Sequence, residues 1–161
     1  MNMLIRNFQK QDIPEMICIW NEVVEAGCAF PQEELLDEKT GLDFFASQTY
    51  TAVAEADGKI AGLYILHPNN IGRCGHICNA SFAVDSRSRG NHIGKQLVQD
   101  CIRQARLHHF GILQFNAVVE NNICARRLYE KIGFIQLGVI KNGFRMKDGT
   151  YANICPYYIE L

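Results

Sequence analysis

A basic, glycine-containing turn lies in the middle of the chain, between an apolar segment that ends at Val84 and an amphipathic segment that begins at Ile93. A turn of this kind presents several backbone N–H groups at the N-terminus of a helix, where partial positive charge accumulates. Arg87, Arg89 and Lys95 add full positive charges beside it. The turn is therefore expected to bind a doubly charged anion such as a pyrophosphate.

Two common nucleotide-binding motifs do not match this turn. A P-loop has two glycines five positions apart and ends in Lys followed by Ser or Thr. Gly90 and Gly94 are four positions apart, and Lys95 is followed by Gln96. The dinucleotide pattern G-x-G-x-x-G is also absent. Taken alone, the two glycines fit an anion site and a simple strand-to-helix turn equally well.

A second segment, residues 122–134, has the pattern N-x-x-A-x-x-L-Y-x-x-x-G-F. Asn122 is a favourable N-cap, and the apolar residues after it recur at helical spacing. Gly133 stands where a helix often ends in a left-handed residue, and Phe134 begins the next strand. Tyr129 lies on this helix, and by itself it fits a core aromatic better than a catalytic group.

Together the two segments resemble the GCN5-related N-acetyltransferases (GNAT). The turn R-S-R-G-N-H is similar to the family signature Q/R-x-x-G-x-G/A, which binds the pyrophosphate of acetyl-CoA, although His92 stands at its last position. The second segment is similar to the family's N-x-x-A-x-x-L-Y-x-x-x-G-F motif, and the two occur in family order. The resemblance covers nearly the whole chain and implies an enzyme that transfers an acetyl group from acetyl-CoA directly to an amine.

The resemblance also implies roles for individual residues. In the family fold the pantetheine arm lies between two splayed strands, which here would be lined by the backbone of residues 82–84. Asn122 would contact the same arm, and Tyr129 would protonate the leaving thiolate. The residues expected to bind the cofactor are Phe82, Ala83, Val84, Arg87, Ser88, Arg89, Gly90, Asn91, His92, Ile93, Gly94, Lys95, Asn116, Asn122 and Tyr129.

The sequence departs from the family pattern at the position of the general base. Many members carry a glutamate on the strand before the turn, but residues 75–82 contain His76 and Asn79 and no carboxylate. His76 can accept a proton near neutral pH, although a histidine at the exposed start of a strand fits as well. Asn79 can orient a substrate or a water molecule, and Glu120 is a third candidate. The predicted catalytic residues are Tyr129, Asn79 and His76, and an amine that is already partly neutral would need no base.

Short similarities also suggest the acceptor. Residues 20–24 resemble a segment of the phosphinothricin and methionine-sulfoximine acetyltransferases, and Asn79 and Asn116 resemble asparagines of the fungal acetyltransferase that acts on the proline analogue azetidine-2-carboxylate. The substrate-binding residues expected are Phe30, Asn79 and Phe144, with Tyr64 as a further wall and Arg73 or Arg145 for a carboxylate. The expected acceptor is a small amine, such as an amino acid. The alternatives are a protein or peptide amine, or a non-catalytic module that senses acyl-CoA.

The charge balance, apolar runs, cysteine count and length of the chain indicate which class of protein it belongs to. Lys and Arg (16) nearly balance Asp and Glu (17), so no overall charge favours nucleic acid or anionic lipid. No apolar run approaches the length of a membrane span. Seven cysteines, an odd number, predict a reducing cytoplasm. The 161 residues predict one domain, and a homodimer is possible by resemblance.

No metal is expected. Cys74, His76 and Cys78 would share one face of a strand. The two cysteines would then be about 13 Å apart, which is too far for one zinc ion.

The periodicity predicts an α/β protein with a mixed sheet and the order β-α-α-β-β-β-α-β-α-β-β. The resemblance adds that the fourth and fifth strands splay apart. Asp57-Gly58 predicts a tight hairpin turn. The strands are expected at 4–8, 50–56, 59–66, up to 84, 112–119, 134–140 and 151–159, with a polar loop at 141–149. The helices are expected at 13–26, 37–47, after 90 and closing at 111, and 122–132.

Overall fold

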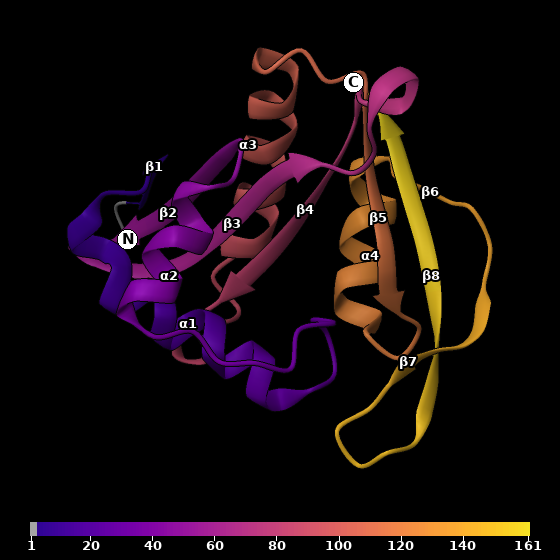
Figure 1. Cartoon of the computed structure of the whole chain (residues 1–161), viewed down its shortest axis with the longest axis horizontal. Helices are drawn as coiled ribbons and strands as arrows, with labels where there is room; N and C mark the ends of the chain where they lie inside the picture. Colours follow the sequence, from indigo (N-terminus) through magenta and orange to yellow (C-terminus); the bar gives the residue numbers. More distant parts are fainter. Residues whose placement is uncertain (1–2) are drawn as a thin grey trace.

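The computed structural model describes residues 3–161, which form one mixed sheet with helices on both faces (Figure 1). The strand order is β1-β2-β3-β4-β5-β8-β6, and β7 also pairs with β8. The strands are β1 (Met3–Asn7), β2 (Tyr50–Ala56), β3 (Lys59–Pro68), β4 (Ile77–Val84), β5 (Ile112–Val119), β6 (Ile135–Gln136), β7 (Ile140–Arg145) and β8 (Tyr151–Glu160). The helices are α1 (Ile13–Ala26), α2 (Glu38–Ala46), α3 (Ile93–Leu107) and α4 (Ile123–Ile132). The predicted α/β class and mixed sheet are confirmed.

Each face of the sheet has its own hydrophobic core. α1 and α2 cover one face, where Trp20 is 1% exposed and packs against Phe30 in a tilted arrangement and against Phe45 edge to face. α3 and α4 cover the other face and pack on the alternate side chains of β3, β4 and β5. Successive side chains of a strand point to opposite faces, and β2, β3 and β4 accordingly contribute to both cores.

The sheet is nearly split between β4 and β5. These two parallel strands pair only at Ile77 with Ile112 and at Cys78 with Leu113. Beyond these two pairs they diverge, as Figure 1 shows toward the lower part of the view. The predicted splay of the fourth and fifth strands is therefore confirmed, and it leaves a gap in the middle of the sheet.

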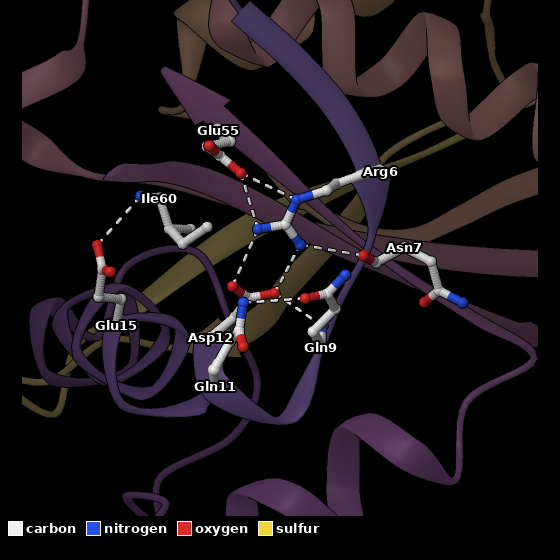
Figure 2. Close-up of polar contacts among 8 residues, drawn as sticks. All are labelled: Arg6, Asn7, Gln9, Gln11, Asp12, Glu15, Glu55 and Ile60. Atoms are coloured by element: carbon white, nitrogen blue, oxygen red, sulfur yellow. Dashed lines mark hydrogen bonds and ion pairs between the residues drawn. The ribbon is translucent and has the colours of Figure 1, made fainter. Parts of the chain in front are cut away.

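The first strand is fastened to α1 by an ion-pair network (Figure 2). Arg6 donates to both carboxylate oxygens of Asp12, at 2.7 and 3.0 Å, and to Glu55 at 2.9 Å. Asp12 is the N-cap residue of α1, but its side chain makes no capping hydrogen bond and accepts from Arg6 and from the N–H of Gln9 instead. Burial would raise the pKa of Asp12, yet these hydrogen bonds outweigh it and hold the pKa below its ordinary value.

The C-terminal part of α3 differs from the sequence prediction. The helix ends at Leu107, short of Gly111, because His109 adopts a left-handed φ of 62°. The N–H of Phe110 bonds to the carbonyl of Ala105, and that of His109 to Arg106. This is a Schellman cap with histidine in the position usually held by glycine.

The strand expected at 134–140 is also shorter than predicted. Only Ile135–Gln136 pairs with β8, because Gly138 has a φ of 153° that interrupts the strand. The chain then forms β7 within the predicted polar loop 141–149, pairing with β8 from Ile140 to Arg145. The hairpin turn is as predicted, with positive φ at both Asp57 and Gly58. Within residues 3–161 no helix is long and apolar enough to cross a membrane.

Candidate active site

A cavity of about 200 Å³ lies where β4 and β5 separate. It is open to solvent and brings together residues from β4, β5, α4 and the loop after α1. Six of the residues predicted from the sequence line it: Phe30, Asn79, Phe82, Asn116, Asn122 and Tyr129. Residues that the sequence did not single out also line it: Ala29, Pro31, Ala80, Ser81, Phe115, Ala117, Val118, Val119 and Ala125. Ser81 follows Asn79 by two residues, so strand alternation alone would have placed it on the same face.

The backbone N–H and C=O groups of successive β4 residues point alternately toward β5 and toward β3. The carbonyl of His76 faces β5, where it accepts hydrogen bonds from Gly111 at 2.9 Å and Ile112 at 3.3 Å. The carbonyl of Ile77 faces β3 and accepts from Asn69 at 2.8 Å. Even-numbered residues of β4 therefore direct their N–H and C=O groups toward β5.

Beyond Cys78 the groups that face β5 have no strand beside them. By the same alternation, the N–H and C=O groups of Phe82 and Val84 point into the gap. Ala83 faces the other way, since its carbonyl lies 2.9 Å from the point where a Cβ on Gly62 of β3 would be. The backbone of Ala83 is thus turned away from the gap, contrary to expectation. Phe82 and Val84 present an open strand edge.

The cap of α4 fixes the position of Tyr129. Asn122 accepts from the N–H of Ala125 at 3.3 Å at the start of this helix. At its end Gly133 has a φ of 115°, and the N–H of Phe134 bonds to the carbonyl of Tyr129 at 3.0 Å. The expected N-cap and C-cap are both present, and together they hold Tyr129 over the mouth of the gap.

The Tyr129 ring is packed, while its hydroxyl is available. The ring lies 4.6 Å from Phe115 and 5.6 Å from Phe134, measured between centroids. The hydroxyl makes no hydrogen bond within residues 3–161. Burial, followed by a smaller contribution from Cys101, raises the pKa of Tyr129, so the phenol stays protonated at neutral pH. The arrangement offers a proton donor to a ligand in the cavity.

Asn79 and Asn116 are both part of an amide-rich surface. The Oδ1 of Asn79 accepts from the N–H of Ala80 at 2.7 Å. Asn116 and Asn69 exchange two amide hydrogen bonds, at 2.7 and 3.1 Å, and Gln114 donates to the same Asn116 oxygen at 3.1 Å. Asn116 has the partner that a polar residue in an apolar strand requires. The sequence did not indicate Asn69, whose role depends on long-range register.

A β-bulge directs Asn116 toward this surface. The register between β5 and β8 slips by one residue between Phe115 and Val118. Pro156 of β8 lies opposite the bulge, and its carbonyl faces away from β5, where it accepts from the N–H of Leu137 at 2.8 Å. A bulge re-aims side chains at functional sites, and here it sets Asn116 at the cavity.

Two of the three candidate bases are not in the cavity. His76 lies before β4, at the end where β4 and β5 are still joined, and does not line the cavity. The carboxylate of Glu120 accepts from the side chain of Asn153 at 2.9 Å and also lies outside. Of the residues that line the cavity, Tyr129 alone has an ionisable side chain. The residues that line the cavity thus supply amides, a hydroxyl and a phenol, and none of them carries a carboxylate.

The basic turn follows β4 directly. Ser86–Ser88 form a short 3-10 turn, capped by Asp85, which accepts from the N–H of Arg87 at 3.0 Å. Gly90 and His92 then adopt left-handed φ values of 84° and 58°. Within residues 3–161 the N–H groups of residues 89–92 have no hydrogen-bond partner. Together with the free N–H groups of the first turn of α3, these groups can donate to an anion.

Side chains around the turn divide into structural and free groups. The guanidinium of Arg87 is held by Asp85, at 2.7 and 3.0 Å, and this contact lowers the pKa of Asp85. Asn91 donates to the carbonyl of Ser88 at 3.1 Å, which closes the turn. Ile93 is buried in the core, so only its N–H can reach a ligand. Arg89, Ser88 and Lys95 make no side-chain hydrogen bond within residues 3–161, and of these Arg89 and Lys95 are exposed and free to neutralise a phosphate.

A groove of about 590 Å³ continues from the cavity, with which it shares Phe30 and Pro31. It lies between the loop after α1 and the β7–β8 hairpin, and the predicted Phe144 lines it. Tyr64 does not belong to it: this side chain is fully buried on the α3 face and donates to Asp100 at 2.7 Å. Arg145 lines the groove, whereas Arg73 lines neither the groove nor the cavity.

Comparisons with known proteins agree with this geometry. A model of the Acetyltransferase (GNAT) family matches residues 16–134. The N-acetyltransferase aca1 of Schizosaccharomyces pombe is 29% identical over 144 residues, which cover 79% of this chain and 69% of the relative.

Solved structures of other acetyltransferases superpose on nearly the whole chain. A GCN5-related N-acetyltransferase from Kribbella flavida is 29% identical, with a TM-score of 0.90 over 99% of this chain and 98% of the other. A phosphinothricin acetyltransferase from Sinorhizobium meliloti, solved in complex with acetyl-CoA, has the same fold at 19% identity, with a TM-score of 0.91 over 100% and 89% of the two chains. The chain belongs to the acetyltransferase (GNAT) family and is an acetyl-CoA-dependent acyltransferase.

Proposed function

We propose that the chain holds acetyl-CoA across the basic turn and the β4–β5 gap and acetylates a small-molecule amine. The residues present fit the cofactor. Unpaired N–H groups at residues 89–92 and the charges of Arg89 and Lys95 match a pyrophosphate. The open edge of Phe82 and Val84 matches the amides of a pantetheine arm, which would bind as an added strand. When bound, acetyl-CoA supplies an activated thioester.

The protein contributes positioning and one proton. The hydroxyl of Tyr129 is protonated and has no hydrogen-bond partner within residues 3–161, and Tyr129 lines the cavity, so it can donate a proton to a departing thiolate. Asn79 and Asn116 hold amide groups at the same cavity and can orient the acceptor. Asn122 caps α4 through its oxygen, which leaves its NH₂ group for the cofactor arm.

The observation that carries this proposal is the absence of charge in the cavity. Tyr129 alone among the lining residues is ionisable, and a cationic ammonium is costly to bury without a partner. The cavity therefore favours the neutral form of an amine. The volume of about 200 Å³ suits a small acceptor or the end of a larger one.

The test is release of free thiol from acetyl-CoA with a panel of acceptors. The panel contains free amino acids, proline analogues, polyamines and a peptide with a free N-terminus. We expect turnover with the amino acids or proline analogues, at a rate that rises with pH as each acceptor loses its proton. Turnover with the peptide alone would contradict the small-molecule acceptor, and no turnover with any amine would contradict the proposal as a whole.

A cytoplasmic location belongs to the same proposal. All seven cysteines are free, and four of them are exposed, which suits a reducing compartment. Labelling the native protein with a thiol reagent after extraction under non-reducing conditions tests this. Exposed cysteines that fail to react because they are oxidised would argue against it.

A further inference from the structure

The cavity and the groove differ in charge. The cavity is lined by apolar, amide and hydroxyl groups. The groove is lined by two acids and two bases, Glu25, Glu33, Arg145 and Lys147. An acceptor whose amine lies in the small cavity must leave the rest of the molecule in the larger groove, because the two share the Phe30–Pro31 wall. Any charged substituent of the acceptor then contacts the charged side chains of the groove.

The two cations of the groove are held in different ways. The Nζ of Lys147 donates to the backbone carbonyl of Glu25 at 2.8 Å, and its Cβ lies against Gly27 at the end of α1. These contacts tie the β7–β8 hairpin to α1, so Lys147 has a structural task. Arg145 instead makes one contact within residues 3–161, an ion pair with Glu33.

The Arg145–Glu33 pair is exchangeable. The side chains are 57% and 74% exposed. Arg145 is the last residue of β7, and Glu33 lies far from it in sequence, in the loop after α1. Exposed ion pairs contribute little to stability, and Glu33 would be hydrated if it lost its partner. A guanidinium binds any carboxylate in the same two-pronged geometry. Glu33 can therefore be replaced on Arg145 by a carboxylate of a ligand.

A second observation in the groove indicates a ligand with a hydrogen-bond donor. The Oε1 atom of Gln32 is buried and has no hydrogen-bond partner in the described part of the chain. Buried acceptors are nearly always paired in proteins. A molecule in the groove that carries an N–H or O–H group beside its carboxylate would satisfy both Gln32 and Arg145.

From this geometry we infer that Arg145 is the carboxylate receptor of the acceptor site and that Glu33 occupies it when no acceptor is bound. The inference rests on the proposed function and narrows the acceptor to amines that also carry a carboxylate. Glu33 acts as an internal competitor, so the two partners of one ion pair should have opposite effects on acceptor binding. A purely structural ion pair would give effects of the same sign.

The test compares the best amino-acid acceptor with its carboxamide, in which the carboxylate is replaced by a neutral group. Arg145→Gln is expected to lower kcat/KM for the amino acid at least about tenfold, through KM, and to leave the carboxamide unchanged. Glu33→Gln is expected to raise kcat/KM for the amino acid about two- to fivefold. Lys147→Gln is the comparison variant: it removes a groove cation together with its tie to Glu25, so any loss it causes should fall equally on the amino acid and on the carboxamide.

The outcomes distinguish a failure of the role of Arg145 from a failure of the proposed function. An equal loss for both acceptors in Arg145→Gln, or a loss in Glu33→Gln, would overturn the role of Arg145. Wild-type turnover of amines without a carboxylate, at the same efficiency, would also overturn it while leaving the proposed function intact. Absence of turnover with every amine would remove both.

Discussion

The proposed cofactor site uses backbone groups, whereas the proposed acceptor site uses side chains. The basic turn after β4 presents backbone N–H groups, fixed by the left-handed residues Gly90 and His92 and by the capping of Asp85. The groove presents side chains from the loop after α1 and from the β7–β8 hairpin, joined by the exposed Arg145–Glu33 pair. A backbone site depends on conformation and tolerates changes of side chain, whereas a side-chain site can be retuned by one substitution.

This difference matches the task of each region. The pyrophosphate is the same for every acetyl-CoA molecule, so a rigid backbone site serves it well. The acceptor differs among acetyltransferases, and loops carry such variation without disturbing the sheet. Tyr129 lines the cavity from a helix that is capped at both ends, and in the proposed function it serves as the proton donor.

The strongest test of this division is Tyr129→Phe. Since its hydroxyl has no partner in the described residues, its loss should leave folding unchanged and lower kcat by about 10²- to 10⁴-fold, with little change in the Kd for CoA. Thiol release and calorimetric CoA binding measure the two effects. An unchanged kcat would exclude Tyr129 as the proton donor.

Tyr157→Phe is the matched control for that variant. The Tyr157 hydroxyl accepts from Arg126 at 3.1 Å and donates to Glu130 at 2.8 Å. Its removal should lower the free energy of unfolding by about 1–2 kcal/mol and leave kcat within about twofold. A large loss of kcat in Tyr157→Phe would mean that disturbed packing lowers kcat by itself, so the loss in Tyr129→Phe could not be assigned to proton donation.

Gly90→Val breaks the backbone site itself. A β-branched residue at a φ of 84° is strained even though its side chain would meet open space. Misaligned N–H groups should weaken CoA binding about a hundredfold or more. Gly58→Val has the same strain at a φ of 79°, also in open space, in the distant β2–β3 turn. Equal loss of CoA affinity in both variants would show that the turn is not the anion site.

The exposed ion pair of the groove can be compared with the buried pair of Arg6 and Asp12. Arg6→Gln leaves a carboxylate that is 6% exposed without its main partner and should cost about 2–3 kcal/mol of unfolding free energy at pH 7. Arg145→Gln should change it by less than about 0.5 kcal/mol. Denaturant unfolding of both variants decides whether the two pairs differ as described.

The pH dependence of the Arg6 effect has a definite sign. The folded-state pKa of Asp12 is depressed, so its contribution is present above the ordinary Asp pKa of about 3.9 and is lost as pH falls through the folded value. The difference between wild type and Arg6→Gln should therefore shrink on acidification. A difference that grew at low pH would contradict this assignment.

The smallest expected effect concerns His92→Gly. Histidine at a φ of 58° carries backbone strain, so glycine should raise the free energy of unfolding by about 1 kcal/mol. Because the site is made of backbone groups, CoA affinity should change by less than about threefold. A large loss of affinity would show that the His92 side chain itself binds the cofactor.

The sequence was most informative where a local rule determines the structure. The caps Asn122 and Gly133, the turn at Asp57 and Gly58 and the gap in the sheet all follow from short motifs or from family resemblance. The end of α3 could not be predicted because His109 accepts a conformation that usually selects glycine. β7 was missed because its pairing depends on β8, which follows later in the chain.

The candidate site was predicted in composition but not in arrangement. The sequence named Asn79, Asn116 and Tyr129 yet could not show that His76 lies on the joined side of the strands. Nor could it show that Arg145 meets Glu33 across 112 positions of sequence. Such contacts arise from register and loop packing, which no local pattern encodes.

The gap between β4 and β5 also affects how long the protein survives. Without acetyl-CoA, the edge of β4 that faces β5 at Phe82 and Val84 is open, and open strand edges recruit other chains. A ligand that fills the gap stabilises the folded state in proportion to the logarithm of its concentration. We therefore expect the enzyme to aggregate sooner, and to be degraded faster, in cells that are short of the acetyl donor, so that its abundance follows its own co-substrate.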